Sequence, residues 1–218
     1  MESSILGILT DNRDVTPLLL DGLQGLEPPD GSSIGIATIV NGQIFSQKVS
    51  GTISDLKPLM PSQGEASSEG IAYQCHPDVE KHRSKLHASE KVAVVYSGVL
   101  LNGPSILNHL LKLGCEFKTQ DDGEIVLRYL NYFSNLETVL SPLKVMDLML
   151  SKLKGHYAII ALFAQPQASV VACCRRLPLA IGHSQEAFYV GSSTLAVKRL
   201  AHPVMQLEES RGSVLSLI

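Results

Sequence analysis

Hydrophobic residues are most concentrated in residues 91–102, where the chain reads KVAVVYSGVLLN. The stretch from Val92 to Val95 is too uniformly apolar for a strand with one face in water, so we predict a central strand covered on both faces. Gly98 permits a sharp backbone turn after it, and Pro104 predicts the start of a helix. A buried strand that ends at a glycine turn is a frequent place for a functional site, although an ordinary exit into a loop gives the same pattern.

The N-terminal part of the chain alternates between strand and helix patterns. Thr16 is the predicted cap of a Leu-rich helix, with Pro17 in its first turn and the Pro28 segment after its end. Asn41-Gly42 is the dipeptide most typical of a tight hairpin. The predicted elements are strands at 5–10, 33–40, 43–50 and 70–74, a short helix at 54–60, and a solvated loop over the polar run 76–87.

Helical patterns and then a meander of strands fill the rest of the chain. A helix at 104–113 is expected to bury Leu107, Leu110 and Leu111, and the helix at 124–133 is expected to be capped by Asp121 or Asp122. A further helix covers 135–153 with a break at 141–142, a short one covers 193–200, and strands are predicted at 156–163, 169–174, 179–182, 187–191, 204–207 and 212–217. This order predicts an α+β fold with antiparallel sheets, and residues 1–218 are interpreted as a single domain.

Composition narrows the possible functions. A hydrophobic content of 44% is sufficient for a full core. The net charge of −3, with scattered Lys and Arg, gives no electrostatic case for binding to nucleic acid or an anionic membrane surface, which requires a basic patch. No apolar run approaches the roughly 20 residues of a membrane span, and the first residues lack the pattern of a signal peptide. We therefore expect a cytoplasmic protein.

The cysteine and histidine spacings give no support for a metal or redox site. No two of the four cysteines, Cys75, Cys115, Cys173 and Cys174, are separated by the two residues typical of zinc or redox motifs, so they are interpreted as buried free thiols. Metal binding by His76, His82 and His87 is the alternative to a solvated loop. Their spacings of six and five match no ligand pattern on a helix or strand, so neither metal nor cofactor is expected.

Several short motifs, in their order and spacing, resemble the class II glutamine amidotransferase (glutaminase) domain of the glucosamine-6-phosphate synthase (glutamine–fructose-6-phosphate aminotransferase) family. They read GIA at 70–72, VVYSG at 94–98, DDGE at 121–124, LKGHYA at 153–158 and LPLAIG at 177–182. The resemblance spans nearly the whole chain. It implies the N-terminal nucleophile hydrolase fold, which is a four-layer αββα sandwich.

The family's chemistry depends on an N-terminal cysteine, and Ser3 stands at that position here. In the family, the thiol attacks the glutamine side-chain amide and the cysteine's own α-amino group acts as the base. Serine could take this role only as the terminal residue, after removal of Met1 and Glu2. A methionine followed by glutamate is not normally removed, so the resemblance implies that both nucleophile and base are lost.

Other positions of the family's site differ in the same direction. Cys75, beside His76, stands where the family has the arginine that binds the glutamine α-carboxylate, and a neutral thiol cannot form that bidentate ion pair. Ser97 and Gly98 replace the Asn-Gly pair of the oxyanion hole. Gly98 keeps the backbone donor, whereas losing the Asn typically costs on the order of 100-fold in rate. Asp122 is retained where the family binds the substrate ammonium, although a helix-cap role explains it equally well.

A scaffold that is kept while its chemistry is lost is the pattern of a pseudoenzyme. The leading hypothesis is therefore an inactive or strongly impaired glutaminase-like domain. It would act by binding glutamine or another small amino compound, a protein partner, or a sugar-isomerase-like domain. The alternative is an active amidohydrolase or amidotransferase that supplies ammonia for amino-sugar synthesis. That enzyme would use Ser3 after processing, with Gly98 and either Tyr96 or His76 in new roles.

Overall fold

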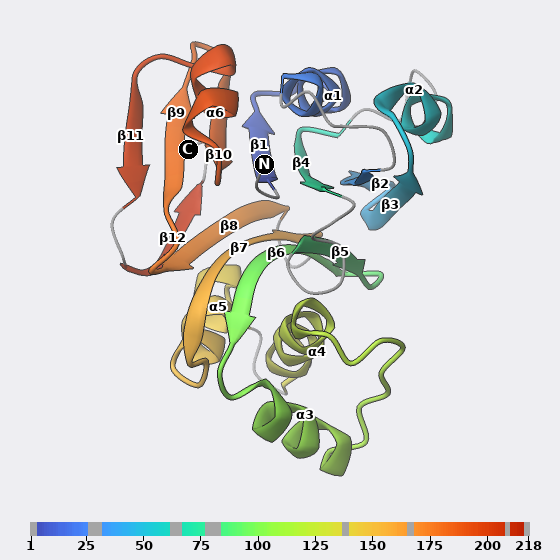
Figure 1. The fold of residues 1–218 in the computed structure, drawn as a ribbon, viewed down its shortest axis with the longest axis vertical. Helices are drawn as coiled ribbons and strands as arrows, with labels where there is room; N and C mark the ends of the chain where they lie inside the picture. The colour runs from blue at the N-terminus through green and yellow to red at the C-terminus, as the bar shows by residue number, and fades with distance from the viewer. Residues whose placement is uncertain are drawn as a thin grey trace.

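Two antiparallel sheets face each other in the computed structural model, which describes residues 4–25, 32–61, 67–76, 84–136, 140–164, 168–207 and 210–215 (Figure 1). The seven-stranded sheet has the spatial order β11 (Val204–Leu207), β9 (Leu179–His183), β10 (Ala187–Gly191), β1 (Ser4–Thr10), β4 (Glu69–Cys75), β2 (Ser33–Val40) and β3 (Gln43–Ser50). The five-stranded sheet has the order β12 (Ser210–Leu215), β8 (Ser169–Arg175), β7 (Gly155–Phe163), β6 (Val92–Leu100) and β5 (Ser84–Ala88).

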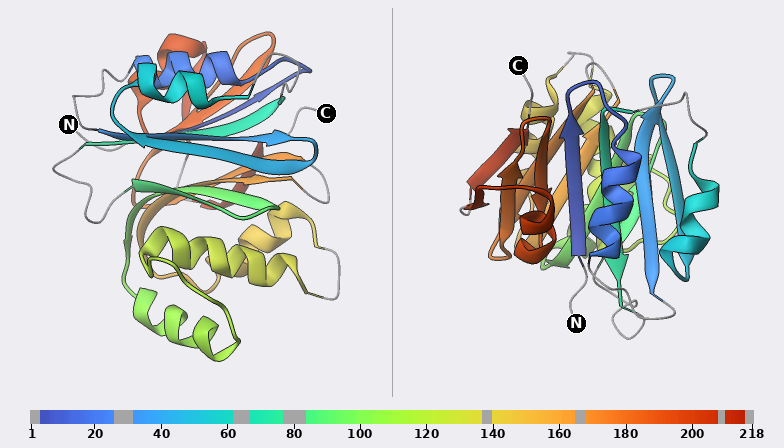
Figure 2. Two further views of the ribbon diagram at one scale, coloured as in Figure 1. Left: turned by 90° about the vertical axis from the view of Figure 1, so that its right-hand side faces the viewer. Right: turned by 90° about the horizontal axis from the view of Figure 1, so that it is seen from above.

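Helices cover the outer face of each sheet, so the layers are helix, sheet, sheet and helix (Figure 2). The seven-stranded sheet is covered by α1 (Thr16–Gln24), α2 (Ile53–Leu56) with its 3-10 continuation (Lys57–Leu59), and α6 (Thr194–Leu200). On the five-stranded sheet lie α4 (Asp122–Ser134) and α5 (Pro142–Leu150), with α3 (Gly103–Lys112) packed against α4. This arrangement confirms the predicted α+β fold and the four-layer αββα sandwich. No helix in the described part of the chain is both long and apolar enough to span a membrane.

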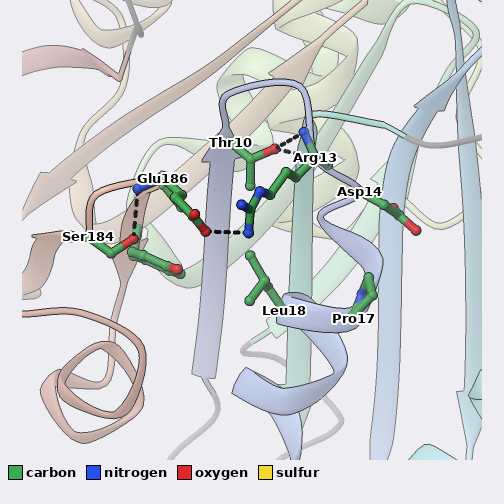
Figure 3. Close-up of a pocket in the computed structure, with 9 residues that line it drawn as sticks. Thr10, Arg13, Asp14, Pro17, Leu18, Ser184 and Glu186 are labelled. Carbon is green, nitrogen blue, oxygen red and sulfur yellow. Dashed lines mark hydrogen bonds and ion pairs between the residues drawn. The ribbon is translucent and has the colours of Figure 1, made fainter.

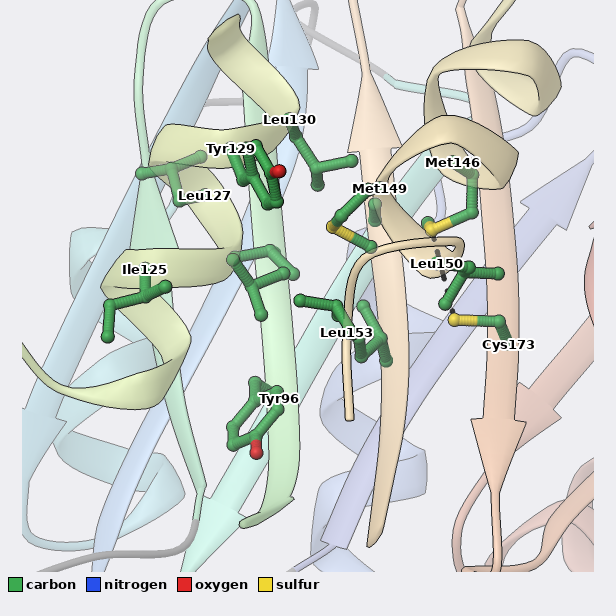
Figure 4. Close-up of a cluster of buried hydrophobic side chains, with 14 of the residues drawn as sticks. Tyr96, Ile125, Leu127, Tyr129, Leu130, Met146, Met149, Leu150, Leu153 and Cys173 are labelled. Carbon is green, nitrogen blue, oxygen red and sulfur yellow. Dashed lines mark hydrogen bonds between the residues drawn. The ribbon is translucent and has the colours of Figure 1, made fainter. Parts of the chain in front are cut away.

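Strand β6 confirms the prediction of a central strand that is buried on both faces. Val92 and Val94 face the helices and pack with α4 and α5, in the cluster that Figure 4 shows in part, whereas Ala93 and Val95 face the other sheet. All four side chains are at most 1% exposed. Gly98 does not end this strand, because β6 continues to Leu100.

The space between the sheets is filled by small and β-branched side chains, and one glycine sets how closely the sheets approach. A β-carbon at Gly7 in β1 would lie 2.8 Å from Cγ2 of Ile160 in β7 and 3.1 Å from Cγ1 of Val170 in β8. These distances are shorter than van der Waals contact, so a larger residue would push the sheets apart.

Local turn chemistry explains the confirmed hairpin between β2 and β3. Asn41 has φ 51° and Gly42 has φ 74°, the positive angles of a type I′ turn. The register follows directly from this turn, with Val40 opposite Gln43 and Ser33 opposite Ser50.

Four other predictions about local structure are also wrong. Thr16 is the first helical residue of α1 and not its cap; the cap position is Val15, and the Thr16 N–H donates to Asp14 Oδ1 at 3.0 Å. The polar run is not all loop, because β5 forms an edge strand that buries Leu86 between the sheets. Leu111 is 44% exposed, since α3 buries Ile106 and Leu110 instead. Asn135 caps the end of α4, and the next helix begins only at Pro142, where proline fits the first turn.

Candidate functional site

The predicted site residues of the seven-stranded sheet lie at one end of the sandwich. β1 begins there with Ser4, which pairs with Gln74, and the next residue along β4, Cys75, pairs with Ser33 at the start of β2. Ser3, the predicted nucleophile position, lies outside the described residues. The start of β1 is held by Ser192, whose Oγ accepts from the Ile5 N–H at 3.0 Å.

The facing sheet brings Ser97 and Gly98 to the same end. The opposite end is marked by a hydrogen bond from the Ile44 N–H, beside the β2–β3 turn, to the carbonyl of Glu90, just before β6. The start of β1 and the exit of β6 toward α3 lie on the same side in Figure 2. Ser97 is half-buried and lies on the same face of β6 as Val95, toward the space between the sheets.

Only glycine fits the backbone at position 98. Its φ is +134°, and a β-carbon would lie 2.1 Å from the carbonyl oxygen of His156 in β7. Gly155, opposite Leu100, has φ +151°, and its β-carbon would lie 2.2 Å from the carbonyl oxygen of Val99. Two reciprocal glycines therefore fix how the end of β6 packs against the start of β7.

Cys75 is fully buried in the hydrophobic cluster between the sheets, with 0% exposure. Its Sγ donates to the carbonyl oxygen of the half-buried His76, at 3.6 Å. The side chain therefore belongs to the core and does not present a polar group to a ligand.

Asp122 ties the start of α4 to the end of β6. Its Oδ2 accepts from the Leu100 N–H at 2.8 Å and lies 3.5 Å from the Tyr96 hydroxyl. Burial and the neighbouring Asp122 charge raise the pKa of Tyr96, so this phenol stays protonated. The cap of α4 is Asp121, whose Oδ1 accepts from the Glu124 N–H at 3.0 Å, and this settles the choice between the two aspartates.

Glu124, whose role no sequence pattern indicates, is a buried carboxylate of this region and is only 2% exposed. Burial raises its pKa, but hydrogen bonds from the backbone N–H groups of Lys118, Thr119 and Gln120 and from the Thr119 hydroxyl outweigh this and lower the pKa to about 2. Arg128 adds an ion pair at 3.1 Å. Glu124 therefore stays ionised and organises the turn that precedes α4.

Cys173, Cys174 and His87 contact other side chains of the fold. Cys173 is buried among α5 side chains, where its thiol donates to Met146 Sδ at 3.8 Å, and burial raises its pKa (Figure 4). Cys174 faces the other sheet, so the two thiols lie on opposite faces of β8. His87 Nε2 lies 2.9 Å from Asp121 Oδ1, and His82 lies outside the described residues. Within the described ranges, no three His, Cys, Asp or Glu side chains are grouped to hold a metal ion.

A pocket of about 220 Å³ lies at the opposite end of β1 from Ser4 (Figure 3). Thr10, Arg13 and Leu18 line one side and Ser184 and Glu186 the other, and an ion pair between Arg13 and Glu186 crosses it. This pocket is therefore separate from the end of the sandwich where the predicted site residues gather.

Comparison with solved structures identifies the fold. Glutamine phosphoribosylpyrophosphate amidotransferase from B. subtilis superposes with a TM-score of 0.73 at 20% identity, covering 94% of this chain and 44% of that one. A glutamine aminotransferase class-II domain protein from Silicibacter pomeroyi superposes with a TM-score of 0.61 at 10% identity, covering 94% and 91%. The αββα sandwich is thus of the N-terminal nucleophile hydrolase type found in glutamine amidotransferases.

Comparison of sequences identifies the family. Glutamine–fructose-6-phosphate aminotransferase (isomerizing) of Bradyrhizobium diazoefficiens is 29% identical over 215 residues, and that of Bartonella henselae is 27% identical over 215 residues. Each alignment covers 97% of this chain but only 35% of the relative. The family described as glutamine amidotransferase domain matches residues 75–199, more than half of the sequence. The chain therefore belongs to the glutamine amidotransferase domain family and resembles the corresponding part of these aminotransferases.

Proposed function

We propose that the chain is a degenerate class II glutaminase domain that has lost the N-terminal cysteine nucleophile and most glutamine-binding residues, and that it acts as a non-catalytic or strongly impaired binding or regulatory domain. The observation that carries this proposal is the burial of Cys75, at the position of the family's carboxylate-binding arginine. A neutral thiol that packs between the sheets and donates to His76 provides no charge for a substrate carboxylate.

The contacts of Asp122 support the same proposal. Part of its acceptor capacity is used by the Leu100 N–H, and the Tyr96 hydroxyl lies beside it. This role in fixing α4 to β6 requires no substrate. Retention of the aspartate is therefore compatible with loss of the glutaminase reaction.

The proposed ligand is glutamine or another small amino compound, and the proposed partner is a sugar-isomerase-like domain or another protein in the cytoplasm. The relatives carry the name aminotransferase (isomerizing), and this chain spans 35% of their length. In this proposal, residues 1–218 form a single domain. It would bind or regulate such a partner without supplying ammonia.

The backbone at Gly98 is compatible with one alternative, an active amidohydrolase or amidotransferase domain. The glycine that supplies the family's backbone oxyanion donor is kept in a conformation that no other residue tolerates. In this alternative, processing would expose the Ser3 hydroxyl and amine, and the enzyme would supply ammonia for amino-sugar synthesis.

Two measurements on the purified protein decide between these functions. Intact mass shows whether the chain begins at Met1 or at Ser3. A glutaminase assay then measures glutamate release by the wild type and by Ser3→Ala, with Ser46→Ala, an exposed serine of β3, as the matched control. We expect an unprocessed chain and no release above background. Glutamate release that Ser3→Ala abolishes and Ser46→Ala preserves would establish the active alternative.

A further inference from the structure

His156 and Arg176 place two basic side chains against each other at one end of the five-stranded sheet. His156 is the second residue of β7 and Arg176 directly follows β8, and Arg176 Nη1 lies 2.9 Å from His156 Nε2. Both residues are exposed. Neither of them pairs with a carboxylate of any residue that the structure describes.

The strand register places His156 on the face that looks toward the seven-stranded sheet. Ala158 in β7 pairs with Cys174 in β8, and both pack between the sheets. Because side chains alternate along a strand, His156, two residues before Ala158, lies on the same face. Arg176 lies just beyond β8, and its contact with the His156 ring places its guanidinium beside that face. Ser97 also pairs with Ala158, so His156 is its diagonal neighbour. The two basic groups therefore lie beside Ser97, at the end where the space between the sheets opens to solvent; we call this end the mouth.

The two consecutive arginines after Cys174 have different roles. Arg175 points to the other face, where its Nη1 donates to the Leu153 carbonyl oxygen at 2.8 Å and its guanidinium lies 5.7 Å from the centre of the Tyr157 ring. Among the described residues, Arg176 has no comparable bond to a carbonyl oxygen or contact with an aromatic ring. Its backbone has φ 60°, a left-handed conformation that glycine adopts without strain. Packing and backbone conformation therefore do not explain an arginine at position 176.

We propose that Arg176 and His156 form an anion-binding site at this mouth, and that the site takes the carboxylate or phosphate group of a small ligand. A guanidinium presents parallel N–H donors that fit two oxygens of either group, and an imidazole can donate a third hydrogen bond. The exposed Lys152 and Lys154, just before β7, add positive potential at this end. The site uses β7 and β8, not the Cys75 position, and it does not require glutamine turnover.

Titration of the protein with inorganic phosphate and, separately, with L-glutamate tests this site. Binding is followed by NMR at constant ionic strength through the His156 ring signals, which are assigned with His156→Gln. We expect saturable shifts of these signals with at least one probe. Saturation by phosphate alone identifies a phosphate-bearing ligand, and saturation by glutamate alone identifies a carboxylate ligand. Linear shifts with both probes would overturn the proposal.

The variant Arg176→Gly separates binding from structure, because glycine suits the left-handed backbone. We expect it to weaken anion affinity about tenfold or more while the thermal unfolding temperature stays equal or rises. The control Lys48→Gln removes an exposed charge on β3 and is expected to keep wild-type affinity. Equal affinity of Arg176→Gly and wild type would refute the site. Because phosphate binding needs no glutamine, this result is independent of the glutaminase assay.

Discussion

A β-carbon on Gly98 would lie 2.1 Å from the carbonyl oxygen of His156 on the neighbouring strand. The same β-carbon would lie 2.7 Å from Cα of Tyr157, and the φ of +134° is unfavourable for any other residue. The backbone at Gly98, the position at which the family builds its oxyanion hole, is thus maintained by packing of main chain against main chain. Fold stability alone is sufficient to retain it, whether or not the chemistry survives.

Gly98→Ala is therefore expected to destabilise the fold on the order of 3 kcal/mol, from backbone strain together with the clash against β7. Urea unfolding of the wild type and the variant measures this difference. Gly42→Ala is the matched control, because Gly42 also has positive φ but a β-carbon there meets nothing within 4 Å. Strain alone should cost the control about 1 kcal/mol. Equal losses in the two variants would show that the contact with His156 is not decisive.

Glu124 should make stability depend on pH in the acid range. Its pKa is lowered from 4.5 to about 2 in the folded protein, so its stabilisation is complete above about pH 4.5 and is lost as the pH falls toward 2. The expected loss is about 3 kcal/mol. Unfolding free energies measured from pH 6 to pH 2 should show this slope in the wild type.

The variant Glu124→Gln should be less stable at neutral pH and should lack that slope, because the backbone N–H groups around it lose an ionised acceptor. Glu186→Gln removes an exposed carboxylate that pairs with Arg13 and should keep the slope. A slope that persists in Glu124→Gln would assign the acid dependence to other carboxylates.

The strands were largely predictable because their signals are local. Val92 to Val95 is apolar without interruption, and Asn41-Gly42 has the two positive φ angles that a type I′ turn needs. One of the errors occurs where contacts distant in sequence decide the outcome. His87 lies in an edge strand that its polar sequence conceals, and it packs against Gly123 at the start of α4.

The sequence predicted which positions belong to the site, but not how their side chains are packed or hydrogen-bonded. The resemblance placed Cys75 and Asp122, but the burial of Cys75 and the bond from Asp122 to the Leu100 N–H depend on how the sheets and α4 pack. Sequence patterns also gave no sign of the pair formed by His156 and Arg176, because these residues are 20 positions apart and meet through the register of β7 and β8. Long-range register is the information that a single sequence lacks.

Thiol labelling tests the burial on which the proposed function depends. Cys75, Cys173 and Cys174 are at most 4% exposed, whereas Cys115 is partly exposed on the helical side. Native protein treated with iodoacetamide should therefore react first at Cys115, as read by peptide mass spectrometry. Cys115→Ser should remove the fast phase and leave the other thiols protected until the protein unfolds. Labelling of Cys75 at the rate of Cys115 would contradict a core position for Cys75.

The link between Asp122 and Leu100 gives a last prediction, which separates structural from ligand-binding roles. Asp122→Ala leaves the Leu100 N–H without its acceptor in a region where Leu100 is 5% exposed, so we expect a loss of about 1–3 kcal/mol in unfolding free energy. Tyr96→Phe should cost less, under about 1 kcal/mol, because its hydroxyl is 3.5 Å from the carboxylate. Urea denaturation measures both variants. If Asp122→Ala were as stable as the wild type but lost affinity for glutamate, the carboxylate would serve a ligand and not the fold.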